Sequence, residues 1–277
     1  MTPCSIDVLR EQVVCIHGGH PERFTLPCSF RSSANGVHAL LRRAGETIAV
    51  GSSSSDSSGA RLITARTDRP RLTCSEFRDL LSNLGGSGEV VVEESLADTA
   101  RTACRELDGT ELQIRYNLSL YRYAGSPASV DHGDPGIRDA TESDVPLIAE
   151  WTRAFDSETG YSRSGCKRDF EQIARENISS CRVVILEVEG VPVAMGQRQR
   201  VSWSGQNRIG LLFVPPEQRS TGHARRVVRG LVASIQEEGA VPCLFTQREN
   251  PISNRLYKGM SFARTEYLVH LASKSGD

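Results

Sequence analysis

The sequence lacks long apolar runs, and it lacks an excess of charge of either sign. Its 277 residues include 33 Lys and Arg against 34 Asp and Glu, which leaves a net charge of −1. That balance argues against nucleic acid as a general partner, and no stretch approaches the roughly 18 apolar residues that a membrane-spanning helix needs. The opening segment MTPCSIDVLREQ carries charged residues where a secretion signal would be apolar. We therefore expect a soluble, cytoplasmic protein that binds neither nucleic acid nor a membrane.

The sequence also lacks any C-x-x-C pair among its eight cysteines. Scattered cysteines in a chain without a predicted secretion signal are typical of reduced thiols packed as small core residues. One group has the side chains that bind zinc, namely Cys15, His17, His20 and Cys28 in the segment CIHGGHPERFTLPC. Because their spacing matches no familiar zinc motif, we interpret this segment as a turn followed by a strand and expect no metal.

A boundary is predicted where Gly, Pro, Ser and Asp displace apolar residues, in GSPASVDHGDPG at 125–136. Such a stretch is typical of a linker or a long loop. We therefore predict an N-terminal α/β module over residues 1–130 and a second domain over 131–277. Apolar periodicity and turn residues predict the following elements in the first module. They are helix 34–46, strands 46–50 and 61–66 joined by a Ser-rich tip at 51–59, helix 75–84, strand 89–94, helix 96–107 and strand 111–124.

The second domain is predicted to follow the order β-α-α-β-β-β-α-β-α-β, which favours a mixed sheet flanked by helices. Thr141 and Asp144 are expected to cap the start of its first helix. The predicted elements are strand 136–140, a helix through 155, a loop at 156–165, helix 166–178, hairpin strands 181–188 and 191–200, strand 207–214, a helix beyond Gly222, strand 241–246, helix 250–259 and strand 266–271.

The segment PPEQRSTGHARRVVRG, residues 215–230, joins one predicted strand to the following helix. Its two prolines cannot donate hydrogen bonds to a neighbouring strand, so the strands are free to separate there. At the start of the helix, several backbone N–H groups without helical partners converge, a geometry that binds phosphate oxygens. Arginines at 219, 225, 226 and 229 add positive charge with no acid between them. The segment therefore predicts a diphosphate site, and the alternative is an ordinary helix start with a solvated basic face.

A second motif, NPISNRLYKG at 250–259, predicts a short helix capped by Asn250. Asn250, Asn254 and Tyr257 fall on one face of this helix, so two amides and a phenol point the same way. Ile252 and Leu256 fall on another face and are expected to pack into the core. The alternative is a capped helix with a half-buried tyrosine and no further role.

From about residue 136 to 271, the sequence resembles the GNAT superfamily of N-acetyltransferases. The resemblance is to the branch that reads R-I-G-x-x-x-x-P-P-x-x-R-x-x-G-x-A and then N-P-x-S-N-x-x-Y. Here these motifs stand as RIGLLFVPPEQRSTGHA and NPISNRLY, in the expected order and at the expected separation. The resemblance implies a GNAT-like α/β fold with a mixed, mostly antiparallel sheet. Residues 131–277 would then be the catalytic acetyltransferase domain, and residues 1–130 are compatible with a degenerate GNAT-like half.

The resemblance also implies acetyl-CoA as co-substrate and an amine as acceptor. The diphosphate would lie on the backbone amides of Arg219, Ser220, Thr221, Gly222, His223 and Ala224, and the pantetheine arm would pair with the backbone of Phe213 and Val214. Asn250 and Asn254 would hydrogen-bond the cofactor or shape the cleft. Tyr257 matches the position that protonates the departing thiolate, and with a reference pKa of about 10 its phenol is available as an acid.

The implied reaction is direct attack of a neutral primary amine, from a small molecule or a peptide, on the thioester in a ternary complex. The strand NRIGLLFV lacks the glutamate that many members carry as general base, so Glu158 and Asp156, predicted in the loop after the first helix, and Glu249 are candidates. Ser261 stands where the family usually has glycine, and we expect Gly259 to provide the turn instead.

Three alternatives remain open. An acyl-CoA-binding sensor or scaffold without turnover would also need the phosphate site, and it would explain the missing strand acid. A glycine-type N-acyltransferase that uses larger acyl groups would differ only in the width of its acyl pocket. A ping-pong route through Cys243 is disfavoured, because a cysteine within an apolar strand is usually a packing residue. The sequence carries no signal of oligomeric state.

Overall fold

The computed structural model describes residues 2–3, 38–44, 46–53, 61–65, 71–86, 88–126, 134–160, 168–180, 182–199 and 205–273. The chain divides into two compact units. The first unit comprises Met1–Tyr121, Phe245–Asn254 and Arg264–Asp277, and the second comprises Arg122–Leu244 and Arg255–Ala263. The division at residue 130 that the linker composition favours stays a prediction.

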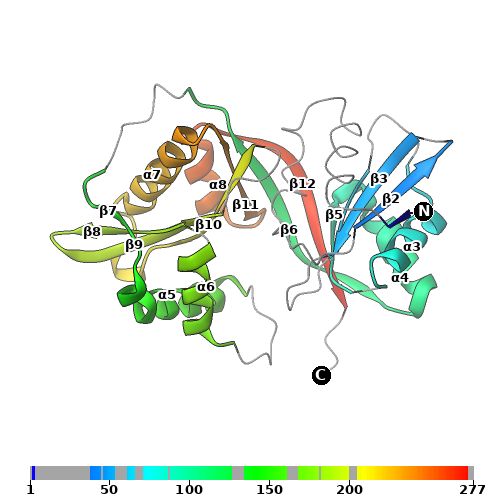
Figure 1. The fold of residues 1–277 in the computed structure, drawn as a ribbon, viewed down its shortest axis with the longest axis horizontal. Helices are drawn as coiled ribbons and strands as arrows, with labels where there is room; N and C mark the ends of the chain where they lie inside the picture. The colour runs from blue at the N-terminus through cyan, green and yellow to red at the C-terminus, as the bar shows by residue number, and fades with distance from the viewer. Residues whose placement is uncertain are drawn as a thin grey trace. The chain divides into compact units, whose positions relative to one another are not determined.

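Strands and helices build the described part of the first unit (Figure 1). Its strands lie in the order β1-β2-β3-β4-β5-β12-β6. Their bounds are β1 Thr2–Pro3, β2 His38–Arg43, β3 Glu46–Ser53, β4 Arg61–Ala65, β5 Val90–Glu93, β6 Leu112–Tyr123 and β12 Phe262–Ser273. Strands β4 and β5 are parallel, whereas β1–β2, β2–β3, β3–β4 and β5–β12 are antiparallel.

Helices α3 (Cys74–Asn83) and α4 (Ala97–Asp108), the latter after the short η2 (Glu94–Leu96), supply much of the first unit's core. Phe77 of α3 and Ala100 of α4 are fully buried in one cluster with Val92 and Val269 from neighbouring strands. Helix α3 begins at a capping box in which the Glu76 carboxylate accepts the N–H of Thr73 at 2.9 Å. The predicted elements from residue 46 to 124 are thereby confirmed where they are described, and residues 54–60 of the Ser-rich tip lie outside the described residues.

The helix predicted at 34–46 is wrong over its described part. Residues 38–43 form β2, which pairs antiparallel with β3 through the register Ala39↔Gly51 and Leu41↔Ala49. Ala39 and Leu41 are buried in the core of the first unit. A short apolar run such as HALL fits a buried strand as well as a helix, so periodicity does not distinguish the two. Ala44, with φ 50°, then turns the chain into β3.

The second unit has strands in the order β11-β10-β9-β8-β7. Their bounds are β7 Ile137–Asp139, β8 Arg182–Val188, β9 Val191–Arg198, β10 Gln206–Phe213 and β11 Val241–Gln247. Only β10–β11 is parallel among these pairs. The helices are α5 Val145–Thr159, α6 Phe170–Ser180, α7 His223–Glu237 and α8 Pro251–Lys258, with the short η4 Glu142–Asp144 and η5 Pro216–Gln218. This order confirms the predicted succession of elements.

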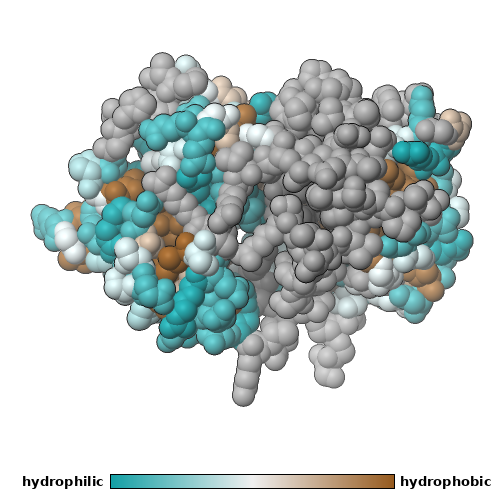
Figure 2. Space-filling view, in the orientation of Figure 1, coloured by the Kyte–Doolittle hydropathy of each residue, from teal (hydrophilic) through white to brown (hydrophobic). Residues whose placement is uncertain are grey.

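Helices cover both faces of the second unit's sheet (Figure 1). On one face, Trp151 of α5 packs with Met195 and Phe213 of the strands. On the other face, α7 approaches so closely that a Cβ on Gly196 of β9 would lie 2.5 Å from Val227. The outward surface of α5 and α6 is mostly hydrophilic (Figure 2). The sheet is therefore buried between two helical layers, and its functional groups must be reached at strand ends and loops.

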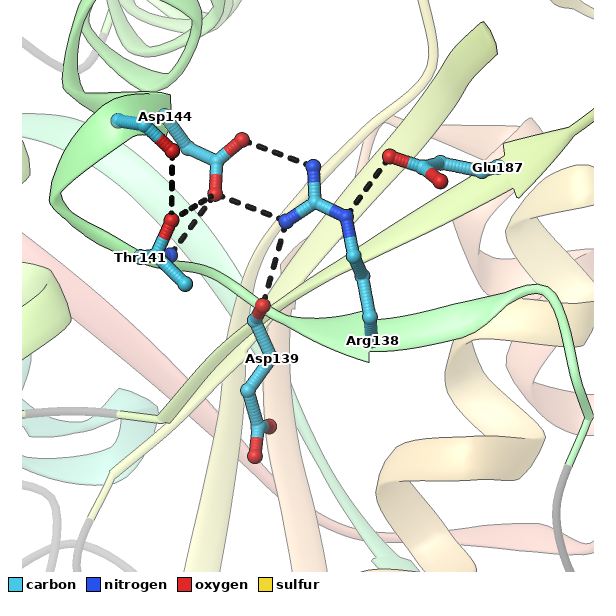
Figure 3. Close-up of polar contacts among 6 residues, drawn as sticks. Arg138, Asp139, Thr141, Asp144 and Glu187 are labelled. Carbon is cyan, nitrogen blue, oxygen red and sulfur yellow. Dashed lines mark hydrogen bonds and ion pairs between the residues drawn. The ribbon is translucent and has the colours of Figure 1, made fainter. Parts of the chain in front are cut away.

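An arginine-centred network fixes the start of this unit (Figure 3). The guanidinium of Arg138 on β7 donates to both carboxylate oxygens of Asp144 at 2.8 Å, and its Nε donates to Glu187 of β8 at 2.7 Å. Asp144 also accepts the N–H of Thr141 at 2.8 Å, which confirms the predicted cap. The Arg138 guanidinium and these hydrogen bonds lower the pKa of Asp144 to about 2.

Two local predictions on helices α5 and α8 are wrong. Helix α5 continues to Thr159 and ends at Gly160 with φ 63°, so Asp156 and Glu158 lie in its last turns and not in a loop. The Ile252 side chain is 81% exposed, so it does not pack into the core as its helical spacing suggested. A helix as short as α8 buries little more than one residue per turn, and the buried residue of α8 is Tyr257.

Candidate functional site

Strands β10 and β11 stop pairing before either strand ends. Their parallel register ends at Ile209↔Leu244 within the described strands, although β10 continues to Phe213, which still pairs with Met195 of β9. The β9–β10 register shifts between Gly210 and Phe213, and Leu211 there has φ 49°. A bulge of this kind bends a strand and redirects its backbone groups. The β11-facing edge of β10 is therefore open just before the proline pair.

The turn from η5 into α7 contains two residues in the left-handed conformation. Ser220 and Gly222 have φ values of 65° and 87°, and Arg219 between η5 and this turn is extended. Among the described residues, the N–H groups of Ser220, Thr221 and Gly222 donate to no backbone carbonyl. His223 and Ala224 add first-turn amides that an α-helix leaves without intrahelical acceptors. Alternating left-handed residues with free amides at a helix N-terminus bind anions, which is the chemistry that a diphosphate requires.

Two predicted site residues meet in an ion pair. The Nη2 of Arg219 donates to both carboxylate oxygens of Glu158, at 2.7 and 2.8 Å, and both side chains are 44% exposed. The Arg219 Nε donates to the carbonyl of Val214 at 3.0 Å, and the guanidinium lies 6.0 Å from the Phe213 ring centroid. Glu158 therefore lies beside the turn, but as the partner of an arginine rather than as a free carboxylate.

Tyr257 is buried near the end of α8. Its side chain is 7% exposed, and its ring meets that of Phe262 edge-on at 5.8 Å between centroids. Burial raises the pKa of the Tyr257 phenol above its ordinary value, because a low-dielectric surrounding disfavours the phenolate. The phenol thus keeps its proton at neutral pH and can act as a donor but not as a base.

The two asparagines of the second motif bond to the chain itself. The Oδ1 of Asn250 accepts the N–H of Ser253 at 3.0 Å, which is the predicted N-cap. The Asn254 amide donates to the carbonyls of Gln247 and Asn250, at 2.9 and 2.6 Å, and its oxygen accepts the Tyr121 hydroxyl at 2.8 Å. Asn254 thereby fixes the turn from β11 into α8. These contacts favour a shaping role over direct contact with a ligand.

The other candidate bases, Asp156 and Glu249, each contact another side chain. Asp156 is buried and forms an ion pair with Arg168. Glu249 accepts a hydrogen bond from the Asn117 amide at 2.7 Å. Cys243 is buried in β11 and its sulfur contacts the Asn207 carbonyl at 3.6 Å, as a packing cysteine does.

The sequence gives no signal for Glu266 of β12, a partly buried acid. Burial and the nearby Glu93 carboxylate raise the pKa of Glu266 to about 8. Its neighbours Arg264 and Thr265 are polar, so the sequence gives no sign of burial, and Glu93 is distant in sequence. The effect depends on strand pairing between β12 and β5.

Ser261 adopts the left-handed conformation with φ 62°. In the family that the sequence resembles, glycine usually stands at this position. Gly259 has no positive φ, so the expectation that it would provide the turn instead is wrong. The carbonyl of Ser261 accepts the N–H of Ala124 at 2.8 Å, which holds this conformation in place.

Within the described ranges, no group of three or more His, Cys, Asp or Glu side chains is arranged to hold a metal ion. The Cys15, His17, His20 and Cys28 segment lies outside those ranges. In the part of the chain that the structure describes, no helix is long and apolar enough to cross a membrane.

Residues 199–269 match the family model described as FR47-like protein. A Drosophila melanogaster protein of known structure has a TM-score of 0.69 at 12% identity, with 99% of this chain and 98% of that chain covered. An acetyltransferase of the GNAT family from Colwellia psychrerythraea has a TM-score of 0.57 at 12% identity, over 99% and 100% of the two chains.

A tandem GNAT protein from the clavulanic acid biosynthesis pathway has a TM-score of 0.57 at 10% identity, over 100% of this chain and 99% of that one. A search of curated proteins by sequence finds no match. At these identities the likeness shows the fold, and it confirms the predicted class of a mixed sheet flanked by helices. The full-length likeness to a tandem protein supports two modules.

Proposed function

We propose that this chain, which carries the fold and the sequence motifs of the GNAT superfamily of N-acetyltransferases, transfers an acetyl or other short acyl group from acetyl-CoA to a primary amine. The acceptor would be a small-molecule amine or a peptide amine. The observation that carries this proposal is the turn at 219–224, whose free amides adjoin the open edge of β10.

The residues of the turn fit a diphosphate. The amides of Ser220, Thr221 and Gly222 supply donors, and a Cβ on Gly222 would meet nothing within 4 Å. The open edge of β10, next to Phe213 and Val214, suits an extended pantetheine arm that pairs with backbone as an added strand does. Bound acetyl-CoA would supply an activated thioester carbonyl.

Tyr257 is the proposed general acid. Because its pKa is raised by burial, the phenol holds a proton throughout the physiological pH range and can give it to a departing thiolate. Proton donation of this kind contributes about 10²- to 10⁴-fold to a rate. The raised pKa of Tyr257 further predicts that its ionisation does not limit the alkaline side of the pH–rate profile.

Glu158 is the proposed group that attracts the acceptor's ammonium or takes its proton through water. In the structure Arg219 neutralises this carboxylate, so either role requires the pair to open. A diphosphate on the turn would compete for the Arg219 guanidinium, since charge-assisted bonds to phosphate are as strong as those to carboxylate. Glu158 would then become available when the co-substrate is bound.

A second candidate function is an acyl-CoA-binding sensor without turnover. The absence of an acid from β10 and the neutralised Glu158 favour it. Both candidates require acetyl-CoA binding, so binding alone does not distinguish them.

Turnover of wild-type protein and of Tyr257→Phe separates the two candidates. CoA release in the presence of a panel of primary amines would be followed with a thiol reagent. We expect a lower kcat by about 10²-fold or more in Tyr257→Phe, with the dissociation constant for acetyl-CoA nearly unchanged. Wild-type protein that binds acetyl-CoA but releases CoA with none of the amines would favour the sensor.

A further inference from the structure

Helices α7 and α8 carry positively charged side chains that no carboxylate neutralises. These are Arg225 and Arg229 of α7 and Arg255 and Lys258 of α8, called here the α7–α8 cationic cluster. None of the four has an ion-pair partner among the described residues, whereas Arg226, their neighbour on α7, pairs with Asp134 at 2.6 Å. Arg219 and Arg138 are paired as well. The four cations are therefore without a neutralising carboxylate in the described part of the chain, unlike Arg226, Arg219 and Arg138.

The cluster is held together by a contact between the two helices. The Nη1 of Arg225 donates to the carbonyl of Gly259 at 3.0 Å, just beyond the last turn of α8. A Cβ on Gly259 would lie 3.4 Å from the Arg225 Nη2 and 3.3 Å from the Arg255 carbonyl. Arg225 therefore lies beside the turn that contains Arg255 and Lys258, and Arg229 follows Arg225 by one helical turn.

The position of Arg225 is electrostatically unfavourable without an anion. The N-terminus of a helix carries partial positive charge, and a cation in the first turn is destabilising there. Arg225 lies in the first turn of α7, which starts at His223, and Arg229 four residues later adds like-charge repulsion. Arg255 and Lys258 are at the favourable end of α8, but they add positive charge around Arg225. A nearby dianion would remove this cost.

We propose that the α7–α8 cationic cluster binds the 3′-phosphate of coenzyme A. This inference rests on the proposed function, which puts the coenzyme diphosphate on the amides at 219–224. In coenzyme A, a single ribose joins the diphosphate to the 3′-phosphate, so the two groups lie within a side chain's length of each other. Arg225 follows Gly222 by three residues, on the helix whose N-terminus forms the diphosphate site. A phosphate monoester carries about −1.5 to −2 charge at neutral pH, which matches a group of several cations.

Binding of coenzyme A and of 3′-dephospho-coenzyme A tests this proposal by isothermal titration. Wild-type protein is expected to bind coenzyme A about tenfold or more tightly than the dephospho form at low salt, because charge-assisted bonds to phosphate are strong. The preference should decrease with added salt, which screens exposed charges. Arg255→Gln and Lys258→Gln should each remove most of the wild-type preference for coenzyme A over the dephospho form. Their affinity for the dephospho form should stay unchanged, which also shows that these variants are folded.

Arg153→Gln is the matched control. Arg153 is an exposed arginine on α5, on the opposite face of the sheet from α7, and its loss changes net charge equally. This variant should keep the wild-type preference. Equal affinity of wild-type protein for both compounds would overturn the cluster proposal and leave the proposed function standing. A preference that survives both cluster variants would overturn it as well, whereas binding of neither compound would remove the proposed function.

Discussion

At the residue scale, Ser261 adopts a left-handed backbone conformation that is unfavourable for a residue with a side chain. A non-glycine residue in this conformation costs about 1–2 kcal/mol, and glycine avoids the penalty at some expense in unfolded-state entropy. Because φ is 62° at Ser261 and the residue is exposed, no packing is lost when its side chain is removed.

Ser261→Gly is therefore expected to raise the free energy of unfolding by up to about 1 kcal/mol. Chemical denaturation with urea would measure it. The control is Ser253→Gly, the same substitution inside helix α8, which should lower stability by about 0.5–1 kcal/mol. Equal losses in both variants would show that the left-handed conformation at 261 is not a source of strain.

Glu158 gives a second prediction at this scale. Glu158→Gln removes the carboxylate that neutralises Arg219, so acetyl-CoA should bind a few-fold more tightly, in line with the roughly 0.2–1 kcal/mol of an exposed ion pair. The KM for the acceptor amine should rise, because the group that attracts its ammonium is gone. Steady-state kinetics with each substrate varied in turn would measure both effects.

Glu150→Gln on the same helix is the matched control for charge, since Glu150 is exposed on α5. Glu150→Gln should change neither the affinity for acetyl-CoA nor the KM for the acceptor amine. An unchanged KM for the amine in Glu158→Gln would remove the acceptor role of Glu158. It would leave Glu158 as a surface partner of Arg219.

At the element scale, the start of the second unit depends on Asp144. Its pKa of about 2 lies below the ordinary value of 3.8, so the folded state binds its proton less readily than the unfolded state does. The stabilisation is therefore present above about pH 4 and is lost as pH falls towards 2. The difference between these two pKa values, about 1.8, corresponds to about 2.5 kcal/mol, an upper bound because Arg138 is 38% exposed and solvent screens the pair.

Asp144→Asn should lower the free energy of unfolding at pH 7 by about 1–2 kcal/mol and flatten its dependence on pH between 4 and 2. Thermal unfolding across that pH range measures the change. Ser143 lies beside Asp144 and is exposed, so Ser143→Ala serves as a control and should keep the wild-type profile. A full wild-type acid dependence in Asp144→Asn would show that the Arg138 network does not stabilise this element.

Some helices, strands and turns can be predicted from neighbouring residues alone, and others cannot. The turn at 215–224 was predictable because prolines, a glycine and the start of an amphipathic helix act through neighbouring residues. The segment 38–43 is a strand because it pairs with β3. A short apolar run does not show whether such pairing occurs, so its periodicity does not distinguish a strand from a helix. The C-terminus of α5 lies beyond its predicted position, because Asp156 is typical of a loop and the sequence does not show its ion pair with Arg168.

At the scale of the whole molecule, contacts distant in sequence determine what the candidate residues do. The Glu158–Arg219 pair joins residues 61 positions apart, and the Tyr121–Asn254 hydrogen bond spans 133. Motifs name the residue types at these positions but not their partners. The sequence therefore predicted the fold class and the turn at 219–224, while the pairing of Glu158 and the hydrogen bonds of Asn254 to the chain itself required the structure.

The two units also interleave along the chain. Strand β11, helix α8 and strand β12 each contribute residues to both units. Composition identified the stretch at 125–136, but it gives no sign that residues 245–254 and 264–277 belong with the N-terminal unit. Residues 264–277 belong with the N-terminal unit because Val269 and Leu271 pack in the core formed by α3, α4 and β5.

The most direct test of the central claim is isothermal titration of the full chain with acetyl-CoA, for wild-type protein and for Gly222→Glu. The substitution adds a negative charge at the turn 219–224, where the proposed function puts a diphosphate, and the new residue must adopt the strained backbone φ of 87°. Saturable binding by wild-type protein that this variant abolishes, with its circular dichroism spectrum unchanged, is the expected result. Absence of binding by wild-type protein at millimolar acetyl-CoA would contradict the account.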